Sequence, residues 1–167
     1  RFTRHQLLPA ILLHDILSQN LGLEEQRTRE VLQNVVGSSG ARFIAFATGV
    51  KSPAAWKSKT ESERIETARQ SITSFLNAEI EEVHEANNSF SFKVTKCHFV
   101  SLCHELNRPN LATLFCGADE VLFGDPQFGV ELNRPQTLAS GGSCCTFHLN
   151  WGNVSSLSQE RERSTKE

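Results

Sequence analysis

The sequence predicts an α+β domain in which N-terminal helices pack on a four-stranded, mainly antiparallel sheet, with β-β-α-α-β-β order in its C-terminal part. Apolar residues recur at helical spacing as far as Leu76, and beyond it they alternate with polar residues in short runs typical of strands. The 167 residues suit one domain whose core is large enough to need no disulfide. We therefore expect a single domain at residues 1–154 and a polar C-terminal tail at residues 155–167.

The first third of the chain predicts three helices. Residues 2–21 carry apolar side chains at helical spacing, and this helix is expected to begin near Pro9, because a proline inside a helix removes a hydrogen bond. Residues 23–36 form the second helix, which ends at a turn over residues 37–40 that is rich in glycine and serine. Residues 41–50, enriched in alanine, form the third helix.

A loop and an amphipathic helix follow. Residues 49–59 contain a proline and several small residues, and we expect them to form a connecting loop. Residues 60–76 place their apolar side chains in one helical stripe. Thr60 and Glu63 have the spacing of a capping box, which indicates the start of this helix.

The second half of the chain predicts four strands and two helices. Phe90, Phe92 and Val94 alternate with polar residues, which indicates a strand with one buried face. Asn87-Asn88 is typical of a hairpin turn before that strand. The expected strands cover residues 78–86, 90–95, 128–132 and 145–151, and the expected helices cover residues 99–106 and 109–123.

Charge and composition exclude several classes of protein. The net charge of −2 argues against surfaces for nucleic acid or anionic membrane, which need an excess of basic residues. The sequence has no apolar run long enough to span a bilayer. Five cysteines without the spacing of a disulfide scaffold favour reduced thiols and a cytoplasmic location. We expect a small-molecule substrate as the partner, no cofactor, and a chain that is compatible with homo-oligomers.

Cys97 is the candidate nucleophile. It follows an alternating strand and precedes a helix, and amide groups at a helix N-terminus can lower the pKa of a nearby thiol. Continued alternation places Cys97 on the face of Lys93 and Thr95, opposite Phe92 and Val94. The alternative is a small buried residue, which is what most cysteines are.

Cys116 and Asp119 are three residues apart, so they share a face of their helix. With Cys97 and Cys145 they have the composition of a metal site of three thiolates and one carboxylate. Their spacing is not that of a zinc finger or zinc ribbon, because the sequence has no CxxC pair. We therefore expect no metal.

Two histidines are candidate proton carriers, because the unperturbed pKa of histidine lies near neutrality. His98 directly follows Cys97, and His148 lies on the more polar face of the last strand. A solvated surface position is the alternative for His148. The sequence has no GxSxG, HExxH, Walker or dinucleotide-binding motif, so classical hydrolase, metalloprotease and nucleotide-binding sites are not indicated.

Residues 83–151 resemble the L-2-amino-thiazoline-4-carboxylate hydrolase-like family. The shared pattern is a strand ending in cysteine, a short helix, a proline-containing linker, a cysteine followed closely by aspartate, and two C-terminal motifs. The matching positions are Cys97, residues 107–111, Cys116 with Asp119, residues 134–139 with Gly142, and Cys145 with Phe147. Where this family usually has aspartate between the last two, the chain has Thr146.

The resemblance implies a role for each matching side chain. Cys97 would be a nucleophile or a polarising thiol, and Asp119 would be a base or an orienting carboxylate. His98 or His148 would carry the proton. The side chains that would bind substrate are Cys116, Thr146 and Arg134.

Three functions are compatible with these residues. The first is ring-opening hydrolysis of a cyclic substrate with carbon–nitrogen and carbon–sulfur bonds. The second is a cyclase or pericyclase of secondary metabolism, favoured by the eleven phenylalanines and by Thr146 in place of aspartate. The third is a non-enzymatic binding domain, because the chain also resembles vinyl-reductase-type ligand-binding domains with cysteines near their C-terminal strands.

Overall fold

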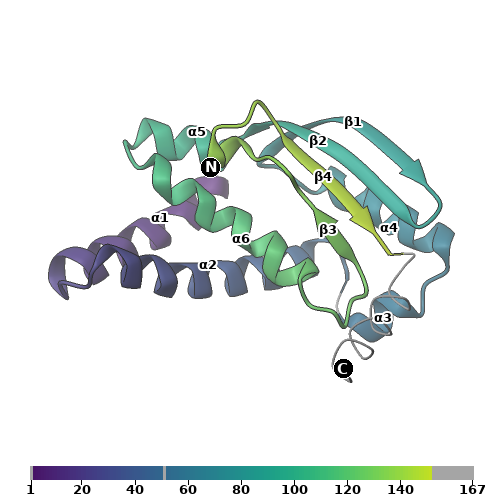
Figure 1. Cartoon of the computed structure of the whole chain (residues 1–167), viewed down its shortest axis with the longest axis horizontal. Coiled ribbons are helices and arrows are strands. Elements are labelled where there is room, and N and C mark those ends of the chain that lie inside the picture. The colour runs from purple at the N-terminus through teal and green to yellow at the C-terminus, as the bar shows by residue number, and fades with distance from the viewer. Residues whose placement is uncertain (1, 51, 152–167) are drawn as a thin grey trace, which may run out of the picture.

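The computed structural model of the protein describes residues 2–50 and 52–151, so the predicted tail at residues 155–167 lies outside the described residues. It confirms the predicted fold class: helices pack beside one four-stranded antiparallel sheet, with strand order β1-β2-β4-β3 (Figure 1). The strands are β1 (Ala78–Ala86), β2 (Ser89–Cys97), β3 (Glu131–Asn133) and β4 (Cys145–Asn150). The α-helices are α1 (Phe2–Asp15), α2 (Glu25–Ala47), α3 (Pro53–Lys57), α4 (Glu61–Thr73), α5 (His98–Glu105) and α6 (Ala112–Phe123).

Helix α1 differs from the prediction at its start. Pro9 lies inside it instead of near its beginning, and a π-helical turn, Ile16–Asn20, extends it. Proline removes one backbone donor from a helix, but the neighbouring side chains Leu7 and Ala10 are buried. Packing of that face therefore outweighs the lost hydrogen bond, which sequence spacing could not reveal.

The turn predicted at residues 37–40 is wrong, because α2 runs without interruption through Gly37 and Gly40. A Cβ atom on Gly40 would lie 2.6 Å from Cβ of Ala118, and one on Gly37 would lie 3.2 Å from Cγ2 of Val121. The glycines therefore allow α2 to approach α6 closely, and the two helices cross side by side in Figure 1. This approach fixes the position of α6, the helix that carries Asp119.

The expected loop at residues 49–59 contains α3. Ser52 caps this short helix by accepting a hydrogen bond from the backbone N–H of Ala55 at 3.2 Å, and Pro53 occupies its first turn. Its Trp56 is buried against the sheet. The predicted capping box of α4 is confirmed, since Thr60 N–H donates to Glu63 at 2.7 Å and Glu63 N–H donates to Thr60 Oγ1 at 3.3 Å.

A β-bulge interrupts the pairing of β1 with β2. Ile80 pairs with Val94 and Glu79 pairs with Lys96, so Thr95 has no counterpart on β1. One extra residue reverses which face the following side chains occupy. β3 is shorter than predicted, because Gly129 adopts a positive φ of 63° and ends the alternation that begins at Phe128.

Two clusters form the core. The first lies between the sheet, α3 and α4, and includes Trp56, Phe90, Phe92 and Trp151. The second joins α1, α2, α5 and α6 around Leu7, Leu32, Cys103 and Leu114. Within residues 2–50 and 52–151, no helix combines the length and the apolar character needed to cross a membrane.

Candidate functional site

Two adjoining pockets lie between the sheet and helices α2, α4 and α6. The larger has a volume of about 150 Å³, and we call it the thiol pocket because Cys97, Cys116 and Cys145 line it together with Asp119 and Arg134. The smaller has a volume of about 70 Å³, and we call it the aromatic pocket because eight of its nineteen lining residues are aromatic. Its aromatic residues are Trp56, Phe75, Phe90, Phe92, Phe123, Phe128, Phe147 and Trp151.

The two pockets share part of their wall. Phe92, Phe147 and Asp119 line both of them, and so does Phe75 of the segment after α4. A ligand near the Asp119 carboxyl therefore has an apolar space on one side and three thiols on the other. This division suits a molecule with a polar reactive part and an apolar part.

Cys97 occupies the predicted junction, as the last residue of β2 and the residue that precedes α5. The predicted face is wrong: Cys97 packs with Phe92 and Val94 instead of opposite them. The bulge at Thr95 causes the difference, because the additional residue shifts the alternation by one position. The thiol consequently lines the pocket.

Asp119 and Arg134 form an ion pair in the wall of the thiol pocket. Nη1 of Arg134 donates to Oδ2 of Asp119 at 2.7 Å, and the side chains retain only 6% and 15% of their exposure, respectively. Nη2 of Arg134 also donates to the carbonyl oxygen of Cys116 at 3.1 Å and to Oε1 of Glu120 at 2.9 Å. The guanidinium lies 5.2 Å from the ring centre of Phe147. Arg134 is thus held on several sides.

Burial changes the pKa of the Asp119 carboxyl. Loss of solvent raises its pKa to about 6, because desolvation outweighs the charge and hydrogen bond of Arg134, which act in the opposite direction. A carboxylate with a pKa close to neutrality is a stronger base than an exposed one and still ionises at neutral pH. Asp119 therefore has the acidity expected of a general base.

Two of the three thiols in the pocket are held in the neutral form. Burial raises the pKa of Cys116 to about 12 and also raises the pKa of Cys145, although the backbone N–H of Leu138 donates to Cys145 Sγ at 3.2 Å. Neither side chain is suited to act as a thiolate at neutral pH. Cys97 differs in position, because it alone among these thiols stands at the N-terminus of a helix.

Three predicted residues lie away from this pocket. His98 is the first residue of α5 and does not line either pocket, and its backbone N–H donates to the carbonyl of Asn77 at 2.8 Å. His148 is exposed and pairs with Ser91 and Asn133 on the sheet face opposite Phe147. Thr146 lies on that same opposite face, so substrate binding by Thr146 and proton transfer by either histidine stay predictions.

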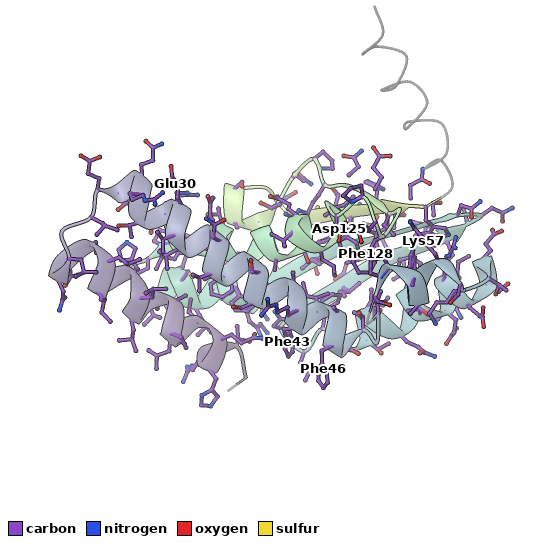
Figure 2. The ribbon with its side chains drawn as sticks, turned by 90° about the horizontal axis from the view of Figure 1, so that it is seen from below. Glu30, Phe43, Phe46, Lys57, Asp125 and Phe128 are labelled. Atoms are coloured by element: carbon purple, nitrogen blue, oxygen red, sulfur yellow. The ribbon has the colours of Figure 1, made fainter. Side chains whose placement is uncertain are left out.

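Sequence reasoning missed the aromatic pocket. Trp56 lies in a segment whose sequence predicts a loop, and Phe123, Phe128 and Trp151 come from separate segments that only the fold brings together. Figure 2 shows Phe128 near Asp125, in the segment that connects α6 to β3. The one signal in the sequence was the high phenylalanine content, which gives no positions.

Residues 2–50 and 52–151 contain no cluster of side chains with the geometry of a metal site. No three histidine, cysteine, aspartate or glutamate side chains of these ranges are placed so that they could hold one ion. The three thiols and the carboxyl of the pocket consequently do not form the metal site considered above.

Comparison with known proteins decides the family. The model of the L-2-amino-thiazoline-4-carboxylic acid hydrolase family matches residues 4–149. The chain belongs to this family. The resemblance predicted from the sequence covers residues 83–151. The match to the L-2-amino-thiazoline-4-carboxylic acid hydrolase family also includes the N-terminal helices. No curated protein matches this family member in sequence.

Two solved structures resemble this member of the hydrolase family at low identity. One is the phenol-responsive sensory domain of the transcription activator PoxR with phenol, at 13% identity and a TM-score of 0.47, covering 93% of this chain and 80% of that one. The other is a trafficking protein particle complex subunit 3 from Naegleria fowleri covalently bound to palmitic acid. It has 14% identity and a TM-score of 0.46, and the match covers 92% of this chain and 98% of that one.

Proposed function

We propose that this chain is a cytoplasmic hydrolase of small heterocycles that needs no cofactor. Its substrate would be a ring with a carbon–nitrogen double bond and a carbon–sulfur bond at one carbon, as in a thiazoline. The single observation that supports this reaction is the presence of Cys97 and Asp119 in one pocket, where the pKa of the Asp119 carboxyl is raised to about 6. A nucleophile and a base of suitable acidity are the parts that such a hydrolysis needs.

The reaction takes place in two steps on the thiol pocket. Cys97 Sγ adds to the amidine carbon, the ring carbon–sulfur bond breaks, and the ring sulfur leaves with the proton of the thiol. Water then adds to the same carbon while Asp119 accepts one of its two protons, and the other proton passes to the former ring nitrogen as the carbonyl forms. The bond between this carbon and Cys97 Sγ breaks, and the Cys97 sulfur recovers the proton from Asp119. One water is consumed, and the product is an N-carbamoyl compound with a free thiol.

Arg134 has a positioning role in this scheme. Its contacts with Asp119, Glu120 and the Cys116 carbonyl fix the orientation of the carboxylate toward the pocket. The charge of Arg134 and its hydrogen bond to Asp119 also lower the pKa of that carboxyl, which burial alone would raise further. Either His98 or His148 as an additional proton carrier remains a separate proposal, tested by His98→Gln and His148→Gln.

The decisive experiment measures release of free thiol from two 2-amino-thiazolines, one with a carboxylate and one with an isopropyl group at ring position 4. We expect Cys97→Ala and Asp119→Asn to lose activity by at least about a hundredfold, the typical contribution of a positioned acid or base. Cys144→Ala is the matched control, since Cys144 is half-buried and lines neither pocket. The rate of the parent chain should rise with pH through about 6 as Asp119 ionises. Full activity of both pocket variants would refute the mechanism.

The aromatic pocket supports two alternative functions, that of a cyclase and that of a non-enzymatic binding domain. Shaped apolar walls are what catalysis by orientation requires, and they also suit a ligand that is only held. A cyclase would keep its activity in Cys97→Ala and lose it when Phe128 is truncated. A binding domain would bind its ligand in both variants and convert nothing.

A further inference from the structure

The pocket offers no free positive charge to a substrate carboxylate. Among the described residues that line the two pockets, Arg134 is the one cationic side chain. Its Nη1 and Nη2 groups already donate to Asp119, Glu120 and the Cys116 carbonyl, and Phe147 lies against its face. These contacts use three of the five N–H groups of Arg134, and the carboxylates of Asp119 and Glu120 already offset its single positive charge. A further carboxylate in this space would be desolvated beside two negative charges and one positive charge, which is costly.

Arg64 lies against Trp56 of the aromatic pocket, and its guanidinium also has hydrogen-bond partners. The Arg64 guanidinium lies 5.8 Å from the ring centre of Trp56, and the Arg64 side chain does not line the aromatic pocket. It donates to the carbonyls of Trp56 at 3.4 Å and of Lys57 at 3.0 Å. The aromatic pocket therefore presents rings to a ligand, with Asp119 as its one ionisable side chain among the described residues.

The dimensions fit a two-part ligand. The thiol pocket, with about 150 Å³, is close to the cavity size of about 150 Å³ that holds a benzene molecule, so it admits one small heterocycle. The aromatic pocket, with about 70 Å³, adds room for a short substituent on the same ring. Because Phe92 and Phe147 border both spaces, the substituent would pass directly from the reactive ring into aromatic surroundings.

We propose that the substrate of this chain is a thiazoline-type cyclic amidine that carries a short branched alkyl group where the substrate in the family name carries a carboxylate. This inference rests on the proposed hydrolase function, whose substrate class it narrows. The amidine would lie beside Asp119, and the apolar group would lie between Trp56, Phe128 and Trp151. Aromatic walls give such a group favourable burial and give a carboxylate none.

A matched pair of compounds tests this substrate class. 2-Amino-4-isopropyl-thiazoline and 2-amino-thiazoline-4-carboxylate are similar in size and shape but differ in the charge of the group at ring position 4. The chain has two tryptophans, Trp56 and Trp151, and no tyrosine, and both tryptophans line the aromatic pocket. Intrinsic fluorescence therefore reports occupancy of that pocket directly. We expect the isopropyl compound to change the emission and to bind on the order of fiftyfold more tightly than the carboxylate.

Two phenylalanine variants provide the control. Phe128→Ala removes part of the pocket wall, whereas Phe46→Ala removes a ring near the end of α2 that is 79% exposed and lines neither pocket (Figure 2). Phe128→Ala should weaken binding of the isopropyl compound by about tenfold and leave that of the carboxylate unchanged. Phe46→Ala should change neither. If Phe128→Ala folds poorly, Phe128→Leu should show a smaller loss in the same direction.

The outcomes separate this inference from the proposed reaction. Tighter binding of the carboxylate, or binding of neither compound, would overturn the proposed substrate class. Tight binding of the isopropyl compound without any release of thiol would support the substrate class and refute the hydrolase. Thiol release from the carboxylate alone would support the hydrolase and overturn the inference.

Discussion

Gly40→Ala tests the close approach of α2 and α6, on which the position of Asp119 depends. The new Cβ would lie 2.6 Å from Cβ of Ala118, a distance that requires one helix to move, because both atoms are attached directly to helical backbone. Overpacking of this kind costs about 1–3 kcal/mol, and the better helix propensity of alanine returns about 1 kcal/mol. The net expectation is a loss of about 1 kcal/mol in the free energy of unfolding, or a fall in Tm of roughly 2–4 °C.

Gly117→Ala is the control for this measurement. Gly117 lies within α6, directly before Ala118, and a Cβ there would meet no atom within 4 Å. The same propensity gain should therefore raise the free energy of unfolding by up to about 1 kcal/mol. Urea denaturation measures both variants, and the double variant Gly40→Ala/Ala118→Gly should recover the packing loss. A Gly40→Ala protein as stable as Gly117→Ala would refute the argument from close approach.

Three further predictions follow from the site. Because the pKa of Asp119 is raised in the folded protein, its protonation adds at most roughly 3 kcal/mol to the free energy of unfolding. This contribution is complete below pH ~4 and is lost as pH rises through about 6. Urea denaturation between pH 4 and 7 should show the decline, and Asp119→Asn should abolish it. Arg134→Ala should lower the free energy of unfolding by about 3 kcal/mol, because it leaves the Asp119 carboxyl buried without its partner, and Arg134→Lys should not restore the full value; an unchanged midpoint in urea would contradict the importance of this pair. Cys103 and Cys116, with pKa values raised to about 11 and about 12, should resist iodoacetamide at pH 8 in the native protein, and rapid labelling of either, mapped by mass spectrometry, would show that burial does not protect it.

The fold class and most helix boundaries could be predicted, because they follow from local patterns. The capping box at Thr60 and Glu63 and the alternation through Phe90, Phe92 and Val94 are properties of short windows of sequence. Gly37 and Gly40 led to an error, since the same residue that favours a turn also lets two helices touch. Only the partner helix distinguishes these cases, and it comes some 80 residues later in the chain.

The site was predictable to the extent that its residues cluster in sequence. Cys97 ends β2, Cys116 and Asp119 both lie on α6, and the fold brings all three to one pocket. His148 was chosen for its chemistry, but the strand directs its side chain to the other face of the sheet. The aromatic pocket could not be found in advance, because its walls come from segments separated by most of the chain.

Because of the bulge at Thr95, the sheet face on which the Cys97 thiol lies depends on the number of residues in this part of β2 and not on the chemistry of its neighbours. The apolar residues of β2 and the whole sequence of α5 could stay unchanged. The presence or absence of one additional residue would still determine whether Cys97 faces the interior or the solvent. A deletion of Thr95 would thus preserve the sheet and direct the sulfur to solvent. Among relatives of this protein, the length of this short stretch would then be a better indicator of a working thiol than the presence of the cysteine itself.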